Sequence, residues 1–201
     1  MKSVYSFFVI AIFFNYCPLA ECGSYNTTLF NSEIHIIPEK PSFRIGDTLW
    51  LASKILCHLK NSNGMQEVNT CFSRKNLETI IYILQIDTTQ TTSLISAPDK
   101  FDYVNKTGSS RVDASVNWHQ WIVSYQRNTL DWTIETALIC KQVGIYALKL
   151  GSIVLSRDTQ ECDEEIIELN ISNLEHHFSL YHGRVNIDSS EIDSWYFFEV
   201  L

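Results

Sequence analysis

Histidine side chains form the densest cluster of groups in this sequence that could do chemistry. His176 and His177 are adjacent, and His182 follows, so the three could bind a metal ion. Adjacent side chains on a strand point to opposite faces, so only an irregular loop would bring these rings together. We therefore expect a solvated loop here and no metal site. Contiguous signatures of hydrolases, zinc proteases and nucleotide-binding loops are absent from the sequence, so we predict no catalytic residues and no cofactor.

Acidic and aromatic residues offer two further kinds of site. Calcium prefers several carboxylate oxygens, but the acidic run around Cys162 lacks EF-hand spacing, and we expect a solvated acidic loop. Tryptophans can build a platform on which sugars stack, but these are spread over several predicted strands, and we expect them mainly in the core. The acidic run is Asp158, Glu161, Asp163, Glu164 and Glu165, and the tryptophans are Trp50, Trp118, Trp121, Trp132 and Trp195.

Cysteine spacing predicts two disulfides. Beyond Cys17 and Cys22 near the N-terminus, four cysteines remain, an even number that is typical of paired cysteines in an exported chain. Two of them flank a polar turn at residues 61–64 and form the natural local pair. The predicted pairs are Cys57 with Cys71 and Cys140 with Cys162, and the alternative is that some of the four are buried free thiols. Without any C-x-x-C, a zinc site is not expected.

The N-terminus predicts export. Lys2 is followed by an apolar stretch over residues 4–14, the pattern of a secretory signal and too short for a spanning helix of ~20 residues. Leu19-Ala20-Glu21-Cys22 resembles a bacterial lipobox, whose cysteine receives the lipid and becomes the first mature residue. Ordinary cleavage after Cys22 is the alternative. We expect a signal peptide over residues 1–21, lipidation at Cys22, attachment to a membrane through that lipid, and a single domain over residues 22–201.

Composition fits a folded acidic protein. The 201 residues include 15 Lys+Arg and 23 Asp+Glu, a formal net charge of −8. Nothing in that balance would neutralise phosphates, so we expect no nucleic-acid partner. The hydrophobic fraction of 45% is ordinary for a globular chain and excludes a disordered one.

Alternating apolar and polar residues predict an all-β fold. Residues 130–138 alternate most clearly and should form a hairpin with residues 121–125 through Asn128, while residues 77–86 are apolar on both faces and should form a central strand. A long strand at 145–155 is interrupted at Gly151 by a predicted bulge, and residues 195–201 should pair inside a sheet. With residues 33–37 and 49–55, we count about eight strands, plus one helical turn at 164–169. This pattern favours an antiparallel β-sandwich with little helix.

Three segments carry a resemblance to a known family. Gly46-Asp47-Thr48, between apolar residues, resembles the opening of immunoglobulin-like domains in bacterial surface proteins. The second segment, Gly144-Ile145-Tyr146, is similar to a strand near the end of such domains. The third segment is Cys162 with the closing residues 196–200. After Cys22, this order resembles uncharacterised exported lipoproteins of the Bacteroidetes. The resemblance implies an immunoglobulin-like β-sandwich at the bacterial outer membrane or cell surface, or otherwise secreted, and implies no catalytic residues.

These observations together favour a non-enzymatic, exported binding or structural module with a protein or glycan ligand. One alternative is a secreted hydrolase whose site is assembled from residues far apart in the sequence. A second is a secreted eukaryotic glycoprotein, suggested by N-x-[ST] sequons at Asn26, Asn105 and Asn170.

Overall fold

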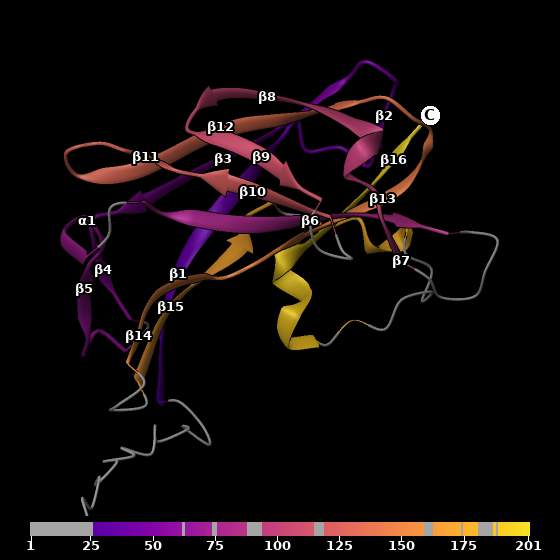
Figure 1. Cartoon of the computed structure of the whole chain (residues 1–201). Coiled ribbons are helices and arrows are strands. Elements are labelled where there is room, and N and C mark those ends of the chain that lie inside the picture. Colours follow the sequence, from indigo (N-terminus) through magenta and orange to yellow (C-terminus); the bar gives the residue numbers. More distant parts are fainter. Residues whose placement is uncertain are drawn as a thin grey trace, which may run out of the picture.

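Two seven-stranded β-sheets face each other in the computed structural model (Figure 1). The structure describes residues 26–61, 63–73, 76–87, 94–114, 119–158, 163–173, 175–180, 187 and 189–201. Sheet A has the order β11 (Gln126–Arg127), β12 (Asp131–Cys140), β3 (Thr48–Leu56), β1 (Asn26–Ile37), β15 (Asp163–Ile171), β14 (Ile153–Asp158), with β8 (Phe101–Thr107) also paired to β12. Sheet B has the order β2 (Ser42–Phe43), β16 (Trp195–Val200), β13 (Gly144–Leu150), β6 (Glu78–Ile86), β10 (Gln120–Ser124), β9 (Ser109–Asp113), with β7 (Leu94–Ser96) also paired to β6.

The remaining elements are short. A small hairpin of β4 and β5 with the one-turn helix α1 lies at one end of the sandwich (Figure 1). The predicted all-β sandwich with little helix is confirmed, although the described residues form sixteen strands where about eight were expected. The short elements are β4 (His58–Lys60), β5 (Glu67–Asn69), α1 (Thr70–Ser73) and three 3-10 helices, η1 (Pro98–Lys100), η2 (Phe178–Leu180) and η3 (Ser189–Ser194).

Two expectations about chain direction and helix are wrong. The helical turn predicted at 164–169 is part of β15, where Ile167, Leu169 and Ile171 alternate as buried side chains with period two. The sheets are also not wholly antiparallel, because β1 pairs with β15 and β16 with β2 in parallel. Each parallel pair joins strands from opposite ends of the chain, so no local turn fixes their relative direction.

The long apolar strands take the places that their patterns predict. β6 lies between β13 and β10, central in sheet B, and after the exposed Glu78 its side chains are buried or half-buried on both faces. β16 pairs with β13 and β2, so the closing aromatic segment lies inside sheet B. The expected hairpin is shorter than predicted, because Asn128 joins β12 to β11, whereas β10 belongs to the opposite sheet. The chain changes sheets at Tyr125, whose backbone N–H donates to Leu77 O at 2.8 Å.

Glycines mark two other places where the chain changes direction or sheet. Gly151 ends β13 in sheet B before β14 begins in sheet A, so the bulge predicted within one long strand is a crossing between sheets. Gly108 joins β8 to β9 across the sandwich with φ of +81°, and a Cβ there would lie 2.5 Å from Ser124 O. A glycine is required at Gly108 for both reasons.

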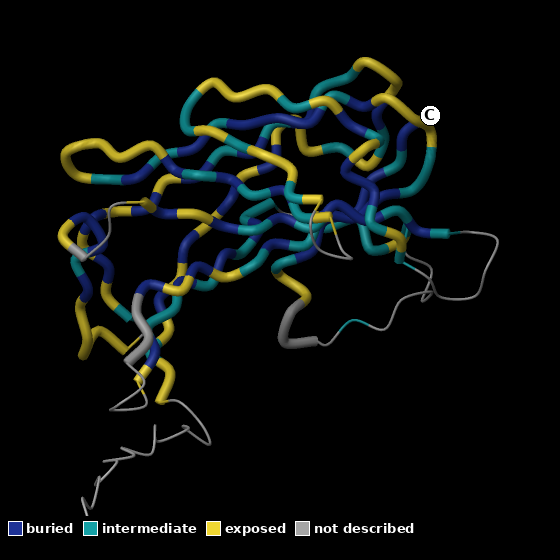
Figure 2. Tube along the Cα trace, viewed as in Figure 1, coloured by how far each residue is buried: buried dark blue, intermediate teal, exposed yellow. Residues whose placement is uncertain are grey.

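Aromatic side chains fill the space between the sheets. The ring centroids of Phe101 and Tyr146 are 4.9 Å apart and those of Phe43 and Phe198 are 5.6 Å apart, and both pairs pack edge-on. Trp121 and Trp132 are fully buried. Exposed residues lie in the loops and also along strands, where they alternate with buried ones (Figure 2). This core fixes both sheets rigidly and leaves their outer faces to carry any site.

Candidate functional site

The outer faces of the two sheets differ in what covers them. Outside sheet B, Trp195 and Phe197 are buried beneath Phe178, Leu180 and Ile187, which come from the chain after β15. His176 O accepts the backbone N–H of Phe197 at 3.1 Å and fastens this cover.

Outside sheet A, the outward side chains of β1 are exposed and those of β3 are half-buried or exposed. Sheet A therefore has an open outer face, whereas the part of sheet B around Trp195 and Phe197 is covered within the described part of the chain.

A groove with a volume of about 680 Å³ lies on this open face. Its floor is Ala52, and the strand register places His35 of β1 and Glu135 of β12 on either side of it. Thr107 of β8 lies beyond Glu135 in the same row. Because alanine is the smallest side chain in this row, the surface is hollowed over Ala52 and its neighbours form walls. The lining residues include Asn31, Glu33, His35, Ala52, Lys54 and Glu135.

The charges around the groove are unequally partnered. Lys54 Nζ lies 2.9 Å from Asp131 Oδ2, and Lys106 Nζ lies 2.7 Å from Glu135 Oε1. Among the described residues, Glu33 forms no ion pair. On the wall formed by β1, the Glu33 carboxylate is therefore solvated and has no paired cation among the described residues.

Hydrogen bonds fix the β1 wall. The His35 ring nitrogen Nδ1 is hydrogen-bonded to Ser172 Oγ. Asn173 reaches the backbone of Ile36 twice, accepting its N–H and donating to its C=O at 2.8 Å each. The side-chain amide thus continues the parallel pairing after β15 ends, and the groove wall is held in place before any ligand arrives.

An apolar row crosses four strands beside the groove. Ile37 of β1 is opposite Trp50 of β3, Trp50 is opposite Ala137 of β12, and Ala137 is opposite Val104 of β8. Ile37 is 52% exposed and Val104 is 40% exposed, whereas Trp50 is half-buried and Ala137 is fully buried beneath its neighbours. This apolar row (Ile37, Trp50, Ala137 and Val104) lies one pleat from the groove floor at Ala52.

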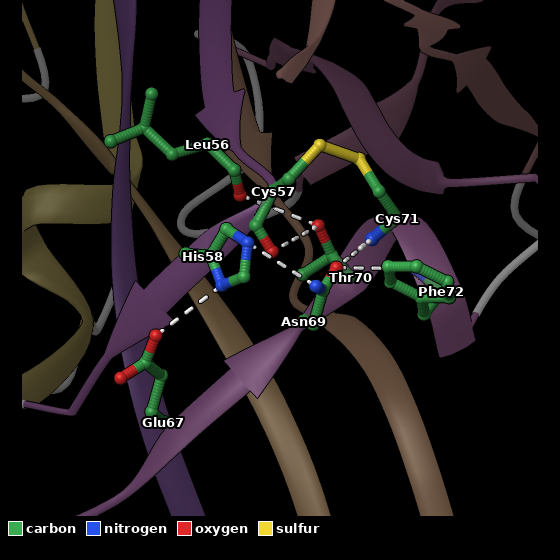
Figure 3. A network of polar contacts seen from close by, with 8 residues as sticks. All are labelled: Leu56, Cys57, His58, Glu67, Asn69, Thr70, Cys71 and Phe72. Atoms are coloured by element: carbon green, nitrogen blue, oxygen red, sulfur yellow. Dashed lines mark hydrogen bonds and ion pairs between the residues drawn. A yellow bond between two sulfur atoms is a disulfide. The ribbon is translucent and has the colours of Figure 1, made fainter. Parts of the chain in front are cut away.

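The β4–β5 hairpin closes the other end of the groove, where Leu59 of β4 joins the lining. A disulfide between Cys57 and Cys71 ties the start of this hairpin to α1, as predicted (Figure 3). The Thr70 backbone N–H donates to Cys57 O at 2.8 Å, and its hydroxyl donates to Leu56 O at 3.3 Å. Covalent and polar links therefore hold the hairpin against the end of β3.

Polar side chains brace the hairpin further. Asn69 Oδ1 accepts two backbone N–H groups of α1 at 3.2 Å each, and Asn69 Nδ2 lies 3.3 Å from His58 Nε2 (Figure 3). His58 Nδ1 in turn lies 3.3 Å from Glu67 Oε1. At the far end, Thr28 Oγ1 of β1 donates to Gln66 Oε1 at 2.8 Å. The end wall of the groove is thus tied to both β3 and β1.

The second predicted disulfide is wrong. Cys140 is a buried free thiol at the end of β12. Its backbone N–H donates to Asp47 O at 2.9 Å, which fixes the residue beside the Gly46 turn and places the side chain in the core. Burial raises the pKa of the Cys140 thiol to about 11. Cys162, its expected partner, lies outside the described residues, as does the predicted lipidation site Cys22.

The structure describes only some of the residues in the predicted histidine and acidic loops. The His176 ring stacks on Phe178 at 5.4 Å, while the His177 ring lies edge-on to Tyr196 at 5.3 Å. His182 and Glu161 lie outside the described residues. Asp163, Glu164 and Glu165 begin β15, and Glu164 is buried, so the expectation of a wholly solvated loop is wrong there.

No group of three or more His, Cys, Asp or Glu within the described ranges is arranged to hold a metal ion. In the same ranges, no helix has the length and apolarity needed to cross a membrane.

Most tryptophans are core residues, as expected, since Trp121, Trp132 and Trp195 are buried. Trp118 lies outside the described residues, and Trp50 is the exception because it lies on the open outer face of sheet A. Alternation along residues 49–55 already places Trp50, Ala52 and Lys54 on one face. The sequence does not reveal which strands flank them, and the groove exists only through those neighbours.

Comparisons with known proteins give no family for this chain. No family model matches it, and no curated protein matches it. Among solved structures, it is similar to the C-terminal domain of the AgI/II polypeptide BspA of Streptococcus agalactiae, with 10% identity, a TM-score of 0.30, and coverage of 71% of this chain and 50% of that one.

Two further similar structures come from Acetivibrio cellulolyticus. The type II cohesin dyad of its adaptor ScaA scaffoldin has 8% identity and a TM-score of 0.31, with coverage of 72% of this chain and 47% of that one. A type II cohesin domain from its cellulosome has 11% identity and a TM-score of 0.26, with coverage of 69% and 91%. This chain spans about half the length of the first two structures.

Proposed function

We propose that this protein is an exported, non-enzymatic module that binds another protein through the outer face of sheet A. The observation that carries the proposal is the apolar row beside a groove on a face that the described chain leaves open, whereas the apolar part of the outer face of sheet B around Trp195 and Phe197 is covered by residues of the chain itself. The described part of the chain does not cover this row, and a continuous apolar strip on an open sheet face is the kind of surface that a protein partner binds.

The composition of the face fits a protein partner. Interfaces between proteins concentrate binding energy in buried aromatic anchors, with aliphatic neighbours and a charged rim that remains wet. Trp50 is the aromatic anchor here, Ile37 lies beside it, Val104 lies beyond Ala137 at the other end of the row, and Lys106 with Glu135 lies at the rim. Strands hold all these residues, so binding orders few side chains and costs little conformational entropy.

Photo-crosslinking in the native host tests this face. A benzophenone amino acid replaces Val104, and the matched control replaces Val112, which is also 40% exposed but lies in β9 at the edge of sheet B. We expect one discrete crosslinked protein from position 104, lost when Trp50→Ala is added, and none from position 112. Equal crosslinking from both positions, or no crosslinked protein from position 104, would contradict the proposal.

Export and anchoring form the second part of the proposal. Lys2 with the apolar stretch over residues 4–14 supports export, and the Cys57–Cys71 disulfide is of a kind that persists in oxidising compartments. Lipidation of Cys22 would attach the module to the bacterial outer membrane or cell surface, and two or more acyl chains suffice for a stable anchor. Metabolic labelling with a palmitate analogue should mark the wild-type protein and not Cys22→Ala. Equal labelling of both would refute the anchor while leaving the binding face untouched.

A further inference from the structure

The groove beside the apolar row has a charge that its own cations do not cancel. Lys54 is held by Asp131 at 2.9 Å, and Asp131 is not among the lining residues. Lys106, at 2.7 Å from Glu135, extends from β8 and is 65% exposed at its side chain, so it is a solvated partner that a ligand can displace. Glu33, on the opposite wall, has no cation among the described residues.

The dimensions of the site suit one long side chain. Glu33 and Glu135 belong to β1 and β12, which are separated by β3, so their walls are roughly 10 Å apart at the usual strand spacing. Ala52 forms the floor between His35 and Glu135, Glu33 lies one pleat along β1 from His35, and the polar groups of Asn31 and Asn170 also line the space. An aliphatic stem can lie over the alanine while its charged end reaches a carboxylate.

We propose that the groove binds a lysine or arginine side chain of the partner protein, whose cationic end lies between the walls and is attracted by Glu33 and Glu135. This inference rests on the proposed function, because the same partner must cover the apolar row. The protein carries a formal net charge of −8, which steers a cationic partner segment toward it and disfavours an acidic one. Apolar residues next to the cation would reach Trp50 one pleat away.

A peptide with a single replaceable cation tests this. The probe is the acetylated and amidated pentapeptide Val-Leu-Lys-Leu-Val, compared with the same peptide carrying uncharged norleucine or glutamate at its centre. Binding to the full chain is followed by NMR of its backbone amides. We expect the lysine peptide to bind about three- to tenfold more tightly than the norleucine peptide, as for a partly solvated ion pair, with shifts centred on Ala52 and Glu135. Rising salt should reduce this difference.

Matched variants locate the charge. Glu33→Gln and Glu135→Gln should each reduce the preference for lysine over norleucine. Glu78→Gln is the control, because Glu78 is paired with Arg111 in sheet B and is 38% exposed at its side chain, against 34% for Glu135. We expect Glu78→Gln to leave the lysine preference unchanged.

Equal affinity for the lysine and norleucine peptides, or shifts centred elsewhere, would overturn the inference. So would groove shifts caused by maltohexaose but not by the lysine peptide, which would make the groove a glycan site. The proposed function fails separately, through loss of the crosslink at position 104. A retained crosslink without any lysine preference would refute only the cation site.

Discussion

Lys54 Nζ lies 2.9 Å from Asp131 Oδ2 on the open face of sheet A, and this pair decides the charge of the groove beside it. Strand pairing sets the arrangement, because Lys54 is opposite Thr133 and Asp131 is opposite Leu56, one pleat further along. The cation that could have neutralised Glu33 is therefore held toward the start of β12.

Asp131 should also make the stability of the fold depend on pH in the acidic range. The Asn128 amide, which donates to Asp131 Oδ1 at 2.7 Å, and then Lys54 hold the pKa of this carboxyl below its ordinary value of 3.8. Because the folded-state pKa is the lower one, ionised Asp131 stabilises the fold above the unfolded-state pKa. This contribution is lost as pH falls through the folded-state pKa.

Urea unfolding between neutral pH and strong acid measures this effect. Asp131→Asn should lower the midpoint at neutral pH and flatten its fall in acid. Glu33→Gln is the control, since Glu33 forms no ion pair among the described residues and its removal should leave the shape of the profile unchanged. Identical acid profiles for wild type and Asp131→Asn would show that this carboxylate does not stabilise the fold.

Gly108 should be far less replaceable than Gly64. Both have positive φ, of +81° and +70°, but a Cβ at Gly108 meets Ser124 O at 2.5 Å, whereas nothing lies within 4 Å of one at Gly64. Gly64→Ala should cost about 1–2 kcal/mol of unfolding free energy, from the left-handed backbone alone. Gly108→Ala adds the clash and should cost roughly 2–5 kcal/mol. Equal losses in chemical denaturation would show that the turn between β8 and β9 shifts away from Ser124 of β10 to accommodate the methyl group.

The sequence predicts the strands of this fold better than their partners. Alternation along residues 49–55 and 130–138 reveals β3 and β12, because each strand has one buried and one open face. The same alternation continues through a change of sheet, since a strand keeps its period of two wherever it pairs. The crossings at Tyr125 and Gly151 therefore leave no trace in the pattern, and they are read as a hairpin and a bulge.

The groove is hidden from the sequence for the same reason. Its rows depend on the register that places His35, Ala52 and Glu135 side by side, although they are separated by 17 and 83 residues along the chain. Only Ala52 carries a visible signal, as a small residue between larger ones on an open face. The local Cys57–Cys71 pair is predictable because a short turn joins its members, whereas the state of Cys140 depends on packing at the end of β12.

The Cys57–Cys71 disulfide should account for much of the stability of the groove's end wall and a measurable share of the whole fold. Its members are 14 residues apart, and closing a loop of this length restricts the unfolded chain by about 3 kcal/mol. The double variant Cys57→Ser with Cys71→Ser should lose about this much unfolding free energy. Reductant should lower the stability of the wild type to a similar extent and leave the double variant unaffected. A wild type insensitive to reductant, once thiol titration confirms that the bond is open, would contradict the prediction.

Cys140 should be almost unreactive until the protein unfolds. Burial raises its pKa from an ordinary value of 9.0 to about 11, so the thiolate fraction at mildly alkaline pH falls by about 100-fold, and the core excludes the reagent as well. Tryptic peptide 128–141 contains Cys140 as its single cysteine, so its iodoacetamide labelling can be followed by mass spectrometry. We expect slow labelling in the folded protein and rapid labelling of the same peptide in denaturant. Rapid labelling without denaturant would show an accessible thiol. A digest without reductant in which peptide 128–141 is linked to the peptide containing Cys162 would show that the two cysteines form a disulfide. Either result would contradict the buried free thiol, and slow labelling with no joined peptide is the outcome that the position of Cys140 in the core requires.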